Sequence, residues 1–272
     1  MKIEPSTIYA AFDRHYQRYA SSGPRAWDIQ HHVDCWRLAE AAFEERSFEQ
    51  FNQLYEELRR NWQVFRGADG EFWSARKTFD HFKALNTLYG RKRLSECNLD
   101  DSEGIWRLLE ATADIKHNKR GPSIVALSKF LHFWNPRLFV IVDSGVIWGS
   151  VLCHWWLWDE VREFRSKVEE RLPGKRLDPS DKVCDALTYV SILLWAAKLV
   201  GDNSQITSGF AEYVNRHAVG HGLPLAEYEG AAVEWFLLGL VELPPAGVSL
   251  AQTCATAAVS DDGHAKLREH AE

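Results

Sequence analysis

Asp143 is the residue of this sequence whose type and surroundings point most directly to catalysis. It follows the apolar run 138–142 and precedes Ser144 and Gly145. A carboxylate that emerges from a buried run can stabilise positive charge on a reacting carbon or activate a water molecule. Asp before Ser-Gly is also a common helix cap, worth about 1 kcal/mol. The residues alone therefore allow a catalytic acid or a cap at this position.

A basic turn lies upstream of Asp143. Its polar residues are Lys116, Asn118, Lys119, Arg120 and Ser123, and they surround Gly121-Pro122. Free backbone N–H groups at the start of a helix suit a phosphate, and lysine and arginine side chains add positive charge. The alternative is a solvent-exposed basic loop in front of an ordinary Gly-Pro helix start.

Lys129 and His132 lie between this turn and Asp143. They are three residues apart, so on a helix they are neighbours on one face. The helix is otherwise mostly apolar, and a buried lysine needs a partner. Asp143 is the candidate partner, either in a purely structural pair or with Lys129 favouring the ionised form of the carboxyl.

The elements that must position these residues are predicted to be helices almost throughout. Runs with apolar residues at helical spacing are separated by Gly, Pro, Ser and Asp breaks. One run, 138–142, looks extended, and Asp143 would open the next helix. No alternation of strands and helices is visible, which argues against a parallel α/β sheet. The predicted helices span about 7–19, 28–45, 48–58, 72–88, 101–115, 123–134, 180–200, 204–218 and 225–241.

Length, composition and charge limit the class of protein and its domain organisation. The chain has 272 residues, of which 46% are hydrophobic and 26% charged, as expected of a folded protein. We expect a helical lobe over 1–100, a second lobe over 101–258 that contains the turn and Asp143, and a polar tail over 259–272. The formal net charge of −6 excludes a globally basic nucleic-acid binder but not a local basic patch.

The cysteines and the apolar stretches argue against a disulfide-rich, zinc-binding or membrane protein. The five cysteines form no C-x-x-C pair, which argues against a disulfide framework or a cysteine-rich zinc site. His31 and Cys35 are spaced i, i+4, but one such pair is too few for a metal site. The longest apolar stretches are far shorter than the roughly 20 residues that span a bilayer. With no secretory signal visible at the N-terminus, a soluble cytoplasmic protein is expected.

The segment 121–146 resembles the helix-hairpin-helix DNA glycosylase superfamily, whose members include the 8-oxoguanine glycosylases. Gly121 matches the hairpin glycine, Ala126 the small residue facing the hairpin, Asn135-Pro136 the loop, and Asp143 the acid, which follows Gly121 by 22 residues. The resemblance covers about 30 residues. Pro122 stands where a second hairpin glycine is usual.

The resemblance implies a DNA glycosylase that acts on double-stranded DNA without a cofactor or metal. The base would be flipped out of the stack and cut from its sugar, while Asp143 stabilises the cationic sugar. Ile124 or Val125 occupies the position of the lysine that bifunctional members use, so base excision without strand cleavage is implied. Aromatic and polar side chains that could line a base pocket are Trp27, His132 and Trp148.

The base is not identified by the sequence. The many aromatic residues are compatible with a bulky or hypermodified base, and a role in repair or in defence against phages with modified DNA fits such a base. One alternative is a metal-free helical ribonuclease marked by Arg-x(4–6)-His, as in Arg76 to His81 or Arg216 to His221, a pattern that also arises often by chance. The other is a non-catalytic helical DNA-binding module in which Asp143 is only a cap.

Overall fold

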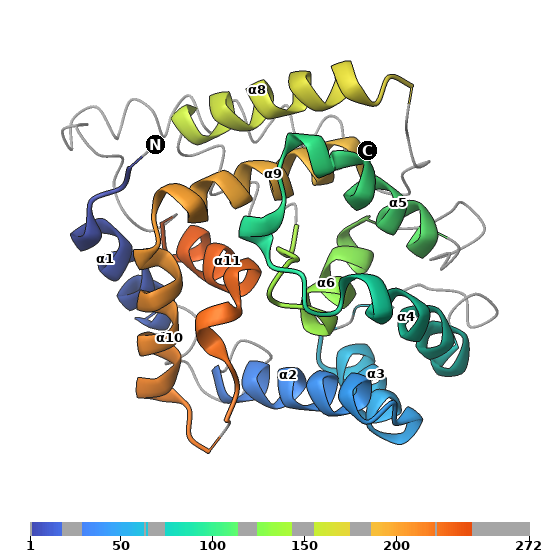
Figure 1. Ribbon diagram of the computed structural model, residues 1–272. Coiled ribbons are helices and arrows are strands. Elements are labelled where there is room, and N and C mark those ends of the chain that lie inside the picture. Colours follow the sequence, from blue (N-terminus) through green and yellow to red (C-terminus); the bar gives the residue numbers. More distant parts are fainter. Residues whose placement is uncertain are drawn as a thin grey trace, which may run out of the picture.

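The computed structural model is an assembly of α-helices, and no strand occurs among the residues that it describes (Figure 1). Those residues are 2–17, 29–62, 64, 74–113, 124–142, 155–174, 186–220 and 222–240. The prediction of an all-α protein is confirmed. The helices are α1 Pro5–His15, α2 Ile29–Glu44, α3 Phe48–Arg60, α4 Ala75–Tyr89, α5 Ser102–Ala113, α6 Ile124–Trp134, α8 Trp155–Arg171, α9 Ala186–Asp202, α10 Gln205–His217 and α11 Glu229–Leu240, with short 3-10 turns η2 Leu94–Glu96, η3 Leu99–Asp101 and η4 Leu225–Glu227.

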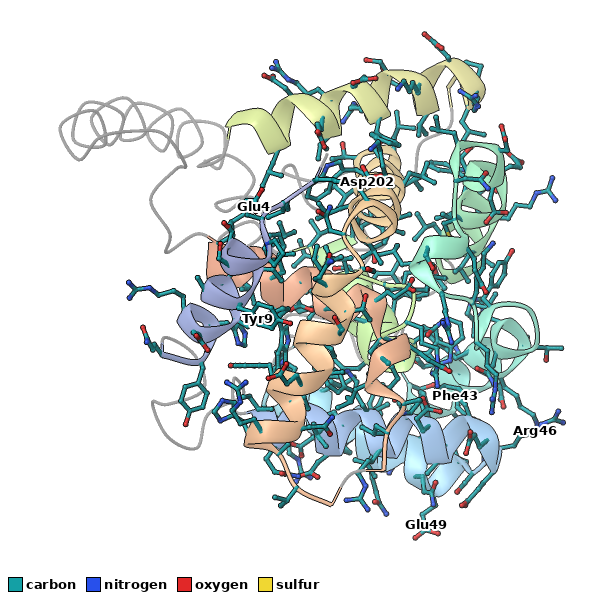
Figure 2. All side chains as sticks on the ribbon, turned by 60° about the vertical axis from the view of Figure 1, so that its left-hand side comes forward. Glu4, Tyr9, Phe43, Arg46, Glu49 and Asp202 are labelled. Carbon is teal, nitrogen blue, oxygen red and sulfur yellow. The ribbon has the colours of Figure 1, made fainter. Side chains whose placement is uncertain are left out.

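The helices are arranged around α6 and α11. Figure 1 shows α8 lying over α9 on one side and the pair α2 and α3 on the opposite side, with α6 and α11 between them. All twelve residues of α11 are buried, and apart from Glu229 and Glu234 its sequence is apolar all round rather than on one stripe. The charged side chains project outward from the outer helices (Figure 2).

The amphipathic helices form for the reasons that their sequence suggests. In α3 the apolar residues Phe51, Leu54, Tyr55 and Leu58 recur at helical spacing, and all four are buried. The Ser47 hydroxyl accepts a hydrogen bond from the Gln50 N–H and so caps the first turn. Ser74 caps α4 in the same way. Burial of one face therefore attaches α3 to α2.

Candidate functional site

Only two of the side chains predicted to form the site, Lys129 and His132, belong to the described part of the chain. Asp143, Trp27, Trp148 and the basic turn lie outside it, and their predicted roles stay predictions; the turn residues concerned are Lys116, Asn118, Lys119, Arg120, Gly121 and Ser123. The described residues of α5 run to Ala113, and those of α6 start at Ile124.

The residues immediately before Asp143 form a fully buried, non-helical segment, 138–142, which we call the buried segment. Leu138, Phe139, Val140, Ile141 and Val142 are each at most 4% exposed. Backbone N–H and C=O groups in such a place need partners, because leaving one unpaired costs about as much as a lost hydrogen bond. No neighbouring strand is described that supplies them.

Side chains of two helices, α6 and α9, supply these partners instead. The His132 Nδ1 donates to the Phe139 carbonyl (2.9 Å), and the Tyr189 hydroxyl of α9 donates to the Val140 carbonyl (3.0 Å). The Ser128 hydroxyl of α6 accepts from the Val142 N–H (3.1 Å). The buried segment is thus held at three successive points up to the residue before Asp143.

The start of the same chain stretch is held by backbone contacts. The Leu94 N–H donates to the Arg137 carbonyl (2.9 Å), and the Ala231 N–H in the first turn of α11 donates to the Pro136 carbonyl (3.0 Å). Gly230 packs directly on the buried segment: a β-carbon there would lie 2.5 Å from the Phe139 carbonyl oxygen. The path from α6 to residue 142 is therefore fixed on every side that the structure describes.

His132 has a second neighbour in α11. Its Nδ1 lies 3.1 Å from the Glu234 Oε2, and both side chains are almost completely buried. Burial lowers the pKa of His132 to about 4, and its hydrogen bond to the Phe139 carbonyl opposes that shift only in part. His132 therefore carries a single ring proton at neutral pH, on Nδ1, where it bonds the buried segment.

Lys129 differs from His132 in its surroundings. It is half-buried, whereas His132 is inaccessible to solvent. Lys129 directly follows Ser128, the residue that bonds Val142. The predicted pair between Lys129 and Asp143 extends beyond the described residues and remains a prediction.

Sequence reasoning assigned no contact to Ser128 and Tyr189, which bond the buried segment, or to Glu234, which approaches His132. Each is a polar residue within an apolar helical stretch, and that contrast is the only signal the sequence offers. This contrast shows that a polar group is buried, but it does not identify the group's partner. Tyr189 and Val140, for example, are 49 residues apart in the sequence.

The His31/Cys35 pair and the Arg–His pairs of the ribonuclease alternative make contacts that are common in folded proteins. The His31 Nε2 lies 3.1 Å from Glu57, while burial and nearby carboxylates raise the pKa of the Cys35 thiol. Across the described ranges, no group of three or more His, Cys, Asp or Glu residues could hold a metal ion.

The arginines of the two Arg–His pairs have other partners: the Arg76 guanidinium lies 3.8 Å from the centre of the Phe48 ring, and Arg216 pairs with Glu212. His221 lies outside the described residues. No described helix is long and apolar enough to cross a membrane.

Comparison with protein-family models, with curated proteins and with solved structures found no match. The family resemblance therefore depends on the residues of segment 121–146 alone.

Proposed function

We propose that this protein is a monofunctional DNA glycosylase in which Asp143 stabilises the sugar cation formed as a base leaves. The observation that carries the proposal is the buried segment. Its last residue, Val142, is bonded to Ser128 of α6, so the backbone that leads into Asp143 starts from a fixed point. A catalytic carboxylate needs such rigid support, because displacement by about 1 Å can cost 100-fold in rate.

The helices on either side of the basic turn also support the proposal. Residues 114–123, which include the basic turn, lie between α5 and α6 in the sequence, and a helix-hairpin-helix element has this order of helix, turn and helix. In that element the turn binds a backbone phosphate through N–H groups and through Lys119 and Arg120. A two-lobed arrangement, with DNA bound between the lobes, belongs to the same proposal.

The proposed roles of the α6 side chains follow from their contacts. Ser128 and His132 are positioning residues, because they bond the backbone at Val142 and Phe139. Lys129, one residue beyond Ser128, is the cation that favours the ionised form of Asp143. Val125 and Ile124, one turn earlier, carry no amine, so no Schiff base forms there and the product is an abasic site in an intact strand.

The decisive experiment compares the parent with Asp143→Asn. Asn is nearly isosteric and is itself a good helix cap, so a capping role would survive the change. Loss of the charge beside a cationic sugar should slow base excision by about 100-fold or more. The measurement is single-turnover formation of alkali-labile sites on a panel of genomic DNAs that carry different base modifications.

Asp159→Asn on α8 is the matched control, since Asp159 is exposed and, among the described residues, pairs with Arg162 on its own helix. Thermal melting and DNA binding should be nearly unchanged in both variants. An Asp143→Asn variant that folds and excises within about tenfold of the parent rate would end this mechanism. A parent protein that makes no abasic sites in any of the DNAs would leave the non-catalytic DNA-binding module as the better account.

A further inference from the structure

A second site lies at the far end of α6 from the buried segment's contact with Ser128. It is a cavity of about 550 Å³ between the end of α2, the end of α4, the loop after α4 and the Trp134–Arg137 turn. Trp134 is six residues after Ser128, which is about 9 Å along the helix axis. The cavity volume is within the range of about 300–1,000 Å³ that is usual for small-molecule sites. Nothing in the proposed DNA reaction uses this cavity.

The inner wall of the cavity includes the carboxylate of Glu40. The Glu40 Oε1 accepts from the Arg137 Nη1 (2.6 Å) and from the Tyr228 hydroxyl (2.9 Å). Arg137 is itself fixed, because its side chain is only 6% exposed and its Nε bonds Glu227 (3.0 Å). Both of these contacts are made by Oε1, and the Glu40 side chain remains 21% exposed in the cavity wall. Glu40 is therefore oriented by its neighbours and can still accept hydrogen bonds from a ligand.

The rim of the cavity presents a pair of opposite charges. The Arg91 Nη2 and the Glu44 Oε1 are 3.0 Å apart, and the two side chains are 82% and 57% exposed. A pair as exposed as this contributes about 0–1 kcal/mol, so a ligand that offers better partners can replace it. Glu44 is one helical turn beyond Glu40 on α2, about 6 Å away.

Contacts in and around the cavity wall keep the cavity in shape. Lys92 is bonded to Asp101, and the Asn135 side chain donates to the Tyr89 and Lys92 carbonyls at 2.9 and 3.2 Å. The loop that carries Arg91 is thereby attached to the end of α6. Phe43, labelled in Figure 2, and Trp134 are almost fully buried and add an apolar wall.

These charges define the chemistry of a matching ligand. A cation and an anion side by side at the rim complement an ammonium and a carboxylate carried by a single carbon, which is the head of an α-amino acid. Glu40, one turn deeper, complements a second group of N–H donors at the end of a side chain long enough to cross that distance. The apolar wall suits the methylene groups between the two ends.

We propose that this cavity binds a basic α-amino acid, with its head between Arg91 and Glu44 and its side-chain cation on the Glu40 Oε2. The probe is free L-arginine, measured by isothermal titration calorimetry on the full chain. We expect a dissociation constant below about 1 mM. Two analogues identify the contacts: citrulline lacks the side-chain charge and should bind at least tenfold more weakly, and agmatine lacks the carboxylate and should also bind more weakly than arginine.

Variants assign each contact to its residue. Arg91→Ala should remove the preference for arginine over agmatine, because the carboxylate then has no partner. Glu40→Gln should remove the preference for arginine over citrulline. Thr87→Trp places a large side chain in the cavity from an exposed position of α4 and should abolish binding without touching the Glu40–Arg137 pair. Arg216→Ala is the matched control, since Arg216 is also exposed and paired with one glutamate.

Three results would overturn the site. The first is arginine binding weaker than about 10 mM. The second is equal binding of citrulline and arginine to the parent protein. The third is an arginine-to-agmatine preference that persists in Arg91→Ala, or arginine binding that persists in Thr87→Trp. None of these measurements involves DNA, so failure here is distinct from failure of the proposed glycosylase.

Discussion

The Ser128 hydroxyl and the Val142 N–H are joined by a 3.1 Å hydrogen bond across 14 residues of sequence. The same hydroxyl donates to the Val125 carbonyl within α6 (3.0 Å), so it uses both of its functions at once. Ser128 is a polar residue in the middle of a buried helix, and this arrangement explains why it is tolerated there. It also makes α6 the support for the chain that leads to Asp143.

Ser128→Ala should destabilise the protein by about 1–3 kcal/mol, because the buried Val142 N–H loses its acceptor. The free energy of unfolding in urea measures this effect. Ser166→Ala on α8 is the control, since the Ser166 hydroxyl is exposed and donates to the Arg162 carbonyl of its own helix; its effect should stay within about 0.5 kcal/mol. Equal effects of the two substitutions would mean that the bond to Val142 contributes nothing to stability.

Stability should fall as the pH is lowered from 7 to 5, in part through His132. Burial depresses its pKa from 6.5 to about 4. The unfolded chain therefore binds a proton below pH 6.5 that the folded protein does not bind until pH 4, and stability is lost over that window. For one such histidine the loss between pH 7 and 5 is about 2 kcal/mol. His15, whose pKa burial lowers to about 3, adds a loss of similar size.

His132→Gln tests the contribution of one residue. Glutamine does not titrate and keeps a side-chain N–H donor. Urea unfolding at pH 7 and pH 5 should show a smaller difference in the variant than in the parent, by about 2 kcal/mol. If the two proteins lose the same stability on acidification, His132 is not the buried neutral histidine that the structure describes.

Two glycine-to-alanine substitutions should change the stability of the protein in opposite directions. Gly230→Ala places a β-carbon 2.5 Å from the Phe139 carbonyl oxygen, so α11 must move away from the buried segment. Overpacking of this kind costs about 1–3 kcal/mol. Gly201→Ala in α9 meets nothing within 4 Å and should stabilise the helix by up to about 1 kcal/mol. Thermal melting of the pair measures both, and a Gly230→Ala protein as stable as the parent would contradict the close packing of α11.

Local elements could be predicted from the sequence because they depend on local patterns. The predicted helix over 28–45 is α2, Ile29–Glu44, and the one over 204–218 is α10, Gln205–His217. Apolar spacing was sufficient for these helices, and Ser204 at the start of α10 makes no capping hydrogen bond with its side chain. The helix predicted over 225–241 is shorter at its start, because the 3-10 turn η4, Leu225–Glu227, precedes α11.

The contacts of the site could not be predicted in the same way. Periodicity shows which face of a helix is buried but not what that face meets. The Tyr189 bond to Val140 and the Glu234 approach to His132 join residues that are 49 and 102 positions apart in the sequence. The Glu40–Arg137 pair in the cavity wall is another such case, since each residue alone resembles an ordinary surface charge.

The salt dependence of DNA binding tests the basic turn. Each phosphate contact that is lost should flatten the log–log slope of affinity against salt by about one unit. We expect this change in Lys119→Ala and in Arg120→Ala, measured by filter binding on double-stranded DNA. Lys77→Ala on α4 is a control that removes an exposed cation elsewhere. An unchanged slope in both turn variants would make the turn a solvated loop.

The extent of the reaction tests the role of α6. A bifunctional glycosylase forms a Schiff base between a lysine and the sugar, which borohydride reduces to a stable covalent adduct. Ile124 and Val125 provide no amine, so we expect base release without strand cleavage and no trapped adduct.

Lys129 is the amine on α6 that could replace the missing lysine, because it directly follows Ser128, the residue that bonds Val142. Trapping should therefore be performed on the parent and on Lys129→Ala with the same DNA. An adduct that forms with the parent and disappears in Lys129→Ala would make Lys129 the nucleophile and give Asp143 the task of deprotonating it. Absence of an adduct in both proteins, with abasic sites formed by the parent, is the result that a water nucleophile beside Asp143 requires.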